Sequence, residues 1–166
     1  MDTTHEVFNQ PAPLVGSNLF THNQALQAAL AFNAPTLDVT SLRDLGERLG
    51  SAEMQTHARL ANVHTPTLHT HDRQGHRTDT VEFHPGYHAL MDAAVSAGLH
   101  GSAWAPGAGA FSHTLRAAGF MLFTELEPSI LCPISMTYAV TPALRANPAI
   151  HGLMGPLLAS RQYDPV

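Results

Sequence analysis

The chain contains no lysine and a single cysteine among its 166 residues, and only 13% of its residues are charged. All eight basic residues are arginines, dispersed between Arg43 and Arg161, and the formal net charge is −5. No basic stripe is available to neutralise the phosphates of a nucleic acid, so we expect this segment to bind DNA weakly at most. Because an average globular domain is about 25% charged, the shortage of charge also suggests that part of the surface contacts other protein.

Two further absences bear on the cellular setting. Cys132 has no second cysteine for an internal disulfide, and its apolar neighbours predict a buried, inert thiol. No apolar run reaches the length of about 18 residues expected of a membrane-spanning helix, and the N-terminus lacks the basic and apolar regions of a signal peptide. We therefore predict a cytoplasmic protein that does not enter a membrane.

The length fits one domain preceded by an extended arm. Residues 1–20 show no helical period and contain Pro11, Pro13 and Gly16, which interrupt regular structure. Their scattered apolar side chains favour packing on the domain or on another subunit over a disordered tail. Residues 21–166 then show the apolar spacing of a mainly α domain.

Apolar spacing and capping residues predict the helices in turn. The first is capped by Thr21 and ends near Asn33, the second is capped by Asp38 or Ser41, and the third runs from Ser51 to Val63. The remaining predicted helices are His84–Gly98, Gly107–Glu127, a helix beginning at Pro133, and a short helix over His151–Ala159. Pro142 predicts a kink or break in the helix that begins at Pro133.

A β-hairpin is predicted between the third and fourth helices, with strands Thr67–His71 and Thr78–Phe83 around a turn at residues 72–75. His69, His71 and His76 have a spacing that could place three imidazoles on one face and hold zinc or nickel. No neighbouring cysteine and no HExxH pattern supports such a site. An exposed polar hairpin is therefore favoured, and a His-rich metal-binding module is the least favoured function.

Motifs for covalent or nucleotide chemistry are missing. There is no GxSxG and no P-loop, and the GlyAlaGly of residues 107–109 lacks the preceding strand of a dinucleotide-binding fingerprint. Glu125 and Glu127 are two residues apart, so on a helix they point in different directions and do not form an acid/base pair. We predict no catalytic, cofactor-binding or metal-binding residue in this chain, which alone is expected to be inactive.

The segment Phe120–Pro142, FMLFTELEPSILCPISMTYAVTP, is strongly apolar. Ile134, Tyr138 and Thr141 share one helical face, and the neighbouring face carries Met136 and Ala139. A helix that is apolar nearly all round needs neighbours on several sides. We therefore expect part of it to meet material outside this chain.

This segment closely resembles the LCPI(S/T)MT(F/Y)A(A/V)TP element of the AidB family, alkylation-response flavoproteins of the acyl-CoA dehydrogenase superfamily. The resemblance extends over nearly the whole chain, in the segments Thr4–Leu14, Ser17–Leu19, Arg59–Val63, Phe83–Pro85 and Ser160–Asp164. It implies an acyl-CoA-dehydrogenase-like N-terminal helical domain. The family's flavin-binding β-domain, C-terminal helical bundle and DNA-binding domain are absent from this chain.

The resemblance also implies a function for the longer protein. That protein would bind FAD, act on an acyl thioester, form homo-oligomers, and contact DNA through its C-terminal domain. In the superfamily the helix corresponding to the LCPISMT element lines the acyl-chain side of the cavity, which assigns that role to Leu131, Ile134, Met136 and Thr137; ordinary core packing is the alternative. A stand-alone helical interaction module is the alternative function, and sequence beyond Val166 would distinguish it from the flavoprotein domain.

Overall fold

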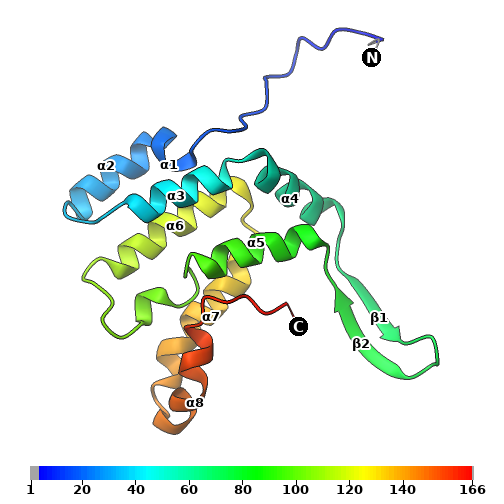
Figure 1. Ribbon diagram of the computed structural model, residues 1–166, viewed down its shortest axis with the longest axis vertical. Coiled ribbons are helices and arrows are strands. Elements are labelled where there is room, and N and C mark those ends of the chain that lie inside the picture. The colour runs from blue at the N-terminus through cyan, green and yellow to red at the C-terminus, as the bar shows by residue number, and fades with distance from the viewer. Residues whose placement is uncertain (1–3, 166) are drawn as a thin grey trace.

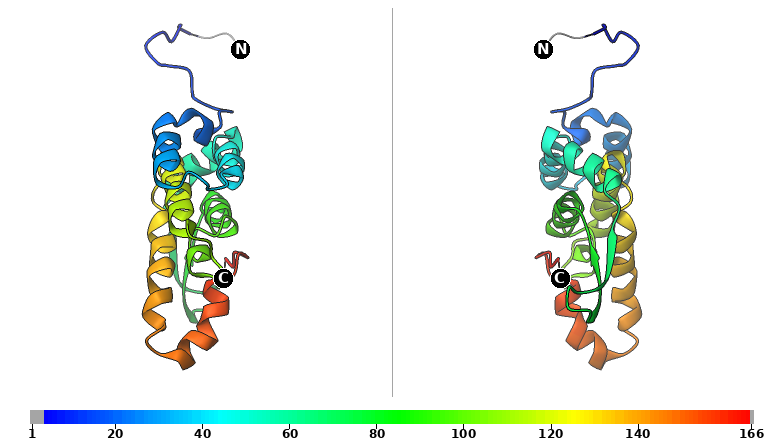
Figure 2. Two further views of the ribbon diagram at one scale, coloured as in Figure 1. Left: turned by 90° about the vertical axis from the view of Figure 1, so that its left-hand side faces the viewer. Right: turned by 90° about the vertical axis from the view of Figure 1, so that its right-hand side faces the viewer.

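The computed structural model describes residues 4–165, which are mainly helical, with one short 3-10 helix and one two-stranded antiparallel sheet. Edge-on views show two helical layers, with α6 and α7 in one and α3 and α5 in the other (Figure 2). The elements in chain order are α1 Leu19–His22, α2 Gln24–Asn33, α3 Thr40–Leu49, α4 Ala52–Val63, β1 Thr67–His71, β2 Arg77–Glu82, α5 Pro85–Ser96, η1 Ser102–Trp104, α6 Ser112–Leu126, α7 Leu131–Leu144 and α8 Pro148–Leu158.

The N-terminal arm projects from one end of the molecule (Figure 1), and its residues 4–16 are exposed. It is tied to the domain near its base, where the Gly16 N–H donates to the Gly50 carbonyl at 2.8 Å and the Gln55 amide donates to the Leu14 carbonyl at 2.6 Å. The arm therefore does not pack along the domain. A contact with another subunit stays a prediction.

Two asparagines, rather than Thr21, begin the first helices. The Asn18 side chain accepts from the Phe20 N–H at 3.0 Å and caps α1, and the Asn23 side chain accepts from the Leu26 N–H at 2.8 Å and caps α2. The predicted cap at Thr21 was wrong because α1 already contains this residue, and the predicted arm is two residues too long for the same reason. Asparagine is preferred over threonine as an N-cap, so the choice of Thr21 passed over two stronger candidates.

The next helices begin close to their predicted positions, although the N-cap of α3 is Val39 and not the predicted Asp38 or Ser41. Asp38 accepts from the Thr40 N–H at 2.9 Å at the start of α3, and the Ser51 hydroxyl accepts from the Met54 N–H at 3.2 Å at the start of α4. The His84 ring accepts from the Gly86 N–H at 3.0 Å, with Pro85 in the first turn of α5. Gly98 follows α5 with a φ of +73°, which glycine adopts without strain.

Gly46 in α3 and Gly50 directly after it allow the chain to cross this helix closely. A Cβ at Gly46 would lie 2.6 Å from the Phe20 nitrogen, and a Cβ at Gly50 would lie 1.6 Å from the Ser17 carbonyl oxygen. The backbone around α1 therefore rests directly on α3. Beneath this crossing lies the common core, whose largest fully buried side chains are Phe123, Leu49, Leu90, Leu122, Ile130 and Ile134.

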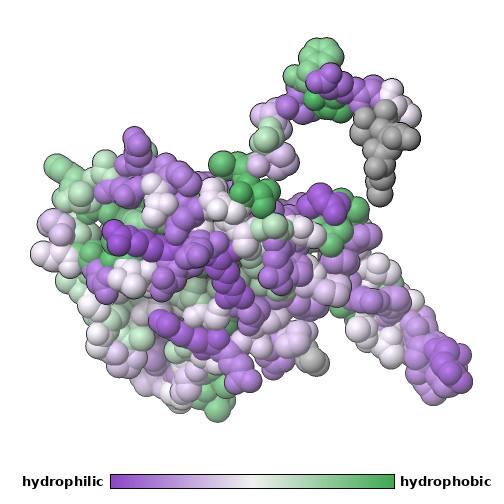
Figure 3. Space-filling view, turned by 45° about the horizontal axis from the view of Figure 1, so that its top comes forward, coloured by the Kyte–Doolittle hydropathy of each residue, from purple (hydrophilic) through white to green (hydrophobic). Residues whose placement is uncertain are grey.

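The hairpin extends away from the helices (Figure 1), and every residue of both strands is exposed. Leu68 is paired with Val81 across the strands, and the register shifts between His69 and His71. The Asp72 carboxylate closes the turn by accepting from the His76 N–H at 2.9 Å. In the space-filling view hydrophilic side chains cover the tip of this projection (Figure 3).

Three helix boundaries differ from the predictions. α6 begins at Ser112 rather than Gly107, because the chain between η1 and α6 contains Pro106 and a Gly107 with a φ of +77°. α7 begins at Leu131 and continues past Pro142 to Leu144, so the helix is not broken there, and α8 begins three residues before His151. Among residues 4–165, no helix is long and apolar enough to span a membrane.

Candidate functional site

A buried carboxylate fixes the turn between α6 and α7, where the predicted pocket wall begins. Glu127 accepts from the Ser129 N–H at 2.8 Å and from the Asn62 side chain of α4. Burial raises the pKa of Glu127, but the hydrogen bonds from Ser129 and Asn62 outweigh it and hold the pKa below its ordinary value. Glu125 instead accepts from Asn23 at 2.6 Å, so the two glutamates have different partners.

The four predicted wall residues lie on different sides of α7. Leu131 and Ile134 are buried in the core, whereas the Met136 side chain is 68% exposed. Thr137 is half-buried, and its carbonyl accepts from the Thr141 hydroxyl at 3.1 Å. Met136 and Thr137 are therefore the members of the set with surface available to something outside the chain.

Cys132 is also exposed, so its predicted burial was wrong: it lies on the outward side of the first turn.

An aromatic cluster holds the inward side of α7. The Trp104 indole N–H donates to the Tyr138 carbonyl at 2.9 Å, and the Tyr138 hydroxyl lies 2.7 Å from the His113 ring nitrogen. The Arg116 guanidinium lies 4.0 Å from the centre of the Tyr138 ring. The sequence analysis did not identify Trp104 as part of this cluster. Pro142 gave a signal, because a proline leaves the carbonyl four residues earlier, here that of Tyr138, without its helical donor and in need of another.

The outer surface of α7 and α8 carries large apolar side chains. No residue of α8 is buried, although the helix is rich in apolar residues. We call these exposed side chains the α7–α8 apolar set: Met136, Ile150, Leu153, Met154 and Leu157. A cavity of about 500 Å³ also opens between the two helices and η1, with Trp104, Arg145 and His151 in its wall.

The hairpin histidines do not assemble into a metal site. His69 pairs with Glu82 at 2.8 Å, His76 pairs with Asp72 at 3.0 Å, and the His71 ring lies 3.1 Å from the Thr70 hydroxyl. Within the described part of the chain, no three histidine, cysteine, aspartate or glutamate side chains are arranged to hold a metal ion. The geometry gives the metal-binding alternative no support.

The glycine loop before α6 does not form a cradle for a flavin nucleotide. A Cβ at Gly107 or at Gly109 would meet no atom within 4 Å, so nothing packs closely against this loop. A phosphate-binding glycine loop is instead placed tightly between a strand and a helix. This loop therefore lacks the close packing of a phosphate-binding glycine loop.

Comparison with known proteins gives consistent matches over nearly the whole chain. The family model described as the adaptive response protein AidB N-terminal domain matches residues 9–165. The putative acyl-CoA dehydrogenase AidB of Escherichia coli (strain K12) is 45% identical over 163 residues, which cover 97% of this chain and 30% of that protein.

Two solved structures share the fold. The apo form of Bd2924 superposes with a TM-score of 0.81 at 29% identity, over 94% of this chain and 32% of that one. Caenorhabditis elegans ACDH-11, solved in complex with C11-CoA, superposes with a TM-score of 0.80 at 19% identity, over 98% of this chain and 29% of that one. The chain thus spans about a third of the length of these relatives.

Proposed function

Because the chain belongs to the AidB N-terminal domain family, we propose that it serves as the helical domain of a longer FAD-dependent acyl-CoA dehydrogenase of the adaptive response to DNA alkylation. It supplies part of the acyl-pocket wall and an oligomer surface, while the flavin and any DNA are bound by other domains. The protein acts in the cytoplasm. The α7–α8 apolar set is the observation that carries this proposal.

The energetics of that set support a covering partner. Leu153 and Leu157 of α8 are 73% and 67% exposed, and Met136 of α7 is 68% exposed. If neighbouring domains cover roughly 200 Å² of this apolar surface, the gain is roughly 5 kcal/mol at about 25 cal/mol per Å². Exposed apolar surface of this kind marks an interaction site.

The acyl-pocket role falls to Met136 and Thr137 within the predicted set. Their side chains have surface outside the core, while Leu131 and Ile134 anchor the same helix from within. A pocket wall needs both exposed and buried side chains. The exposed ones contact the ligand, and the buried ones fix the helix that positions them.

A dye-binding experiment tests the proposal. The wild-type chain should bind a hydrophobic fluorescent dye and self-associate at high concentration, and the double variant Met136→Ser/Leu153→Ser should lose most of both. Phe32→Ser is the matched control, since Phe32 is 86% exposed but lies on α2. A monomeric wild-type chain that binds no dye, or an equal loss in the control, would contradict the assignment.

A further inference from the structure

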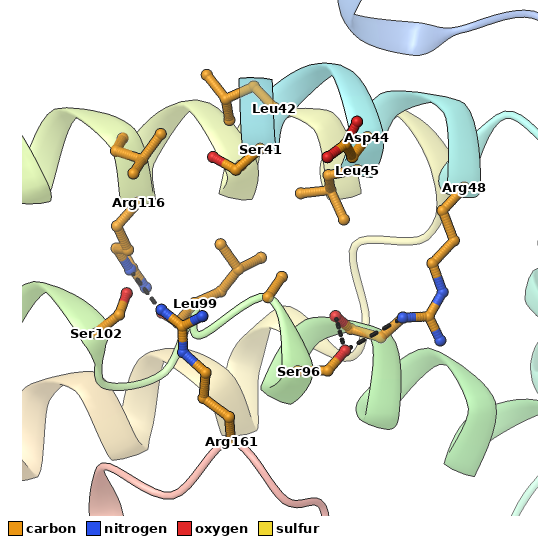
Figure 4. Close-up of a pocket in the computed structure, with 14 residues that line it drawn as sticks. Ser41, Leu42, Asp44, Leu45, Arg48, Ser96, Leu99, Ser102, Arg116 and Arg161 are labelled. Carbon is orange, nitrogen blue, oxygen red and sulfur yellow. Dashed lines mark hydrogen bonds between the residues drawn. The ribbon is translucent and has the colours of Figure 1, made fainter. Parts of the chain in front are cut away.

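A groove between α3, α5 and α6 gathers three arginines (Figure 4), away from the α7–α8 apolar set. Its volume is about 320 Å³, near the lower limit of small-molecule sites, which begin at about 300 Å³. Arg48 comes from α3, Arg116 from α6, and Arg161 from the segment after α8. The three arginines differ in how their charges are satisfied.

Arg48 is already engaged at one end of the groove. Its guanidinium donates to the Asp92 carboxylate at 3.1 Å and to the Ser96 hydroxyl at 3.2 Å. The Asp92 carboxylate therefore neutralises the charge of Arg48.

Arg116 is only partly satisfied. Its Nε donates to the Leu99 carbonyl at 3.0 Å, and its guanidinium packs on the rings of Phe120 and Tyr138. Its Nη2 atom is buried and has no hydrogen-bond partner among the described residues. A charged donor without an acceptor is costly, so the guanidinium of Arg116 has hydrogen-bonding capacity left over.

Arg161 is held beside the same loop. The segment that carries it is anchored on both sides, by the His100 ring 2.8 Å from the Ser160 carbonyl and by the Tyr163 hydroxyl 2.8 Å from the His88 ring. A Cβ at Gly98 would lie only 3.1 Å from the Arg161 Nε, so glycine makes room for this side chain.

The two guanidinium groups therefore meet at one loop. Figure 4 shows Arg116 descending from α6 and Arg161 rising toward it beside Ser102. Within residues 4–165 neither makes an ion pair, and the carboxylate in the groove wall, Asp44, lies on α3. Two like charges at one loop are stabilised by an oxyanion between them, which arginine binds through paired N–H groups.

Four leucines supply apolar surface in the wall of the groove: Leu42, Leu45, Leu99 and Leu115. We propose that the groove binds a small amphipathic anion, with a phosphate or carboxylate head held by Arg116 and Arg161 and an apolar body held by the leucines. The serine hydroxyls in the wall, which include Ser102, are additional donors to the head group.

Titration of the chain with phenyl phosphate, phenylacetate and neutral benzyl alcohol tests this site. At least one of the two anions should shift the amide NMR signals of Leu99 and Ser102 at concentrations where benzyl alcohol does not. The stronger of the two anions identifies the head group as phosphate or carboxylate. Equal shifts from benzyl alcohol, or no response to either anion at millimolar concentration, would overturn the proposal.

Variants separate the arginines from general surface charge. Arg161→Gln should weaken anion binding at least about tenfold, as expected for losing a charge-assisted hydrogen bond, and Arg161→Lys should retain part of it. Arg73→Gln, in the exposed hairpin turn, removes the same charge elsewhere and should leave binding unchanged. Arg116→Gln would also remove the packing of the guanidinium on the aromatic rings, so its effect on binding would be ambiguous. Arg161 is exposed, so Arg161→Gln is the decisive variant, and unchanged binding in it would contradict the site.

Discussion

The Trp104 side chain replaces a hydrogen bond that Pro142 removes from α7. In a regular α-helix the N–H of residue 142 would donate to the Tyr138 carbonyl, but proline has no N–H. The Trp104 indole donates to that carbonyl at 2.9 Å instead. The Arg145 guanidinium lies over the Trp104 ring, 5.3 Å from the ring centre, and donates to the Trp104 backbone carbonyl at 3.1 Å. One side chain thus joins η1 to the second half of α7.

Trp104→Phe should lower the free energy of unfolding because it removes this donor while keeping an aromatic ring. The lost hydrogen bond alone corresponds to about 1 kcal/mol. Pro142→Ala restores a backbone N–H to the Tyr138 carbonyl, so the double variant should lose less stability than the sum of the two single changes. Urea unfolding followed by circular dichroism measures all four proteins, and strict additivity would show that the two residues are not coupled in this way.

Gly46→Ala should destabilise the chain, because the new methyl group would lie 2.5 Å from the Asn18 side-chain oxygen and 2.6 Å from the Phe20 nitrogen. Overpacking of this kind costs about 1–3 kcal/mol. Gly152→Ala is the matched control on α8, where a Cβ would meet nothing within 4 Å. It should be neutral or stabilising by up to about 1 kcal/mol. Thermal unfolding of both variants checks the difference, and equal melting temperatures would contradict the close crossing.

Glu127→Gln should lower stability at neutral pH and much less in acid. The folded pKa of Glu127 lies below the reference value of 4.5, because the hydrogen bonds from Ser129 and Asn62 outweigh the burial that raises the pKa. The ionised carboxylate therefore stabilises the fold above pH 4.5, and this contribution is lost as the pH falls through the lower folded pKa. Unfolding at several pH values should show the two proteins converging in acid. Glu47→Gln, at an exposed position of α3, should track the wild type throughout.

The purified chain should be colourless and should not retain FAD after desalting. The loop at Gly107 and Gly109 has no closely packed surroundings, and the flavin contacts are expected in other domains. Absorbance across the visible flavin bands is the measurement. A stoichiometric yellow protein would place the cofactor site within these 166 residues.

The sequence predicted most of the helices and the hairpin because their local signals agree with the fold. The helices predicted to start at Ser51 and His84 do begin there, with these two residues as their caps, and Leu68 and Val81 form a cross-strand pair. The errors arose where tertiary contacts decide. The Thr21 cap was wrong because Asn18 is fixed over Gly46. A break at Pro142 does not occur, since α7 continues to Leu144 and Trp104 donates to the Tyr138 carbonyl.

The site was predicted less completely for the same reason. Apolar periodicity identified α7 but did not separate its buried residues, such as Ile134, from its exposed ones, such as Met136, because the helix is apolar on nearly every side. Nor could spacing bring Arg116 and Arg161 together. They are 45 residues apart by their numbers, and they meet only because Ser160 and Tyr163 are tied back to α5 and the loop that follows it.

The fully exposed hairpin has a consequence for the motions of the molecule. A two-stranded sheet without a covering layer is marginally stable in water, so β1 and β2 can open while the helical core stays folded. Their amide hydrogens should then exchange with solvent far faster than those of α6, which contains the fully buried Leu122 and Phe123. The segment between α4 and α5 is thus a separate unit of local unfolding, able to become ordered on a neighbouring surface without disturbing the core.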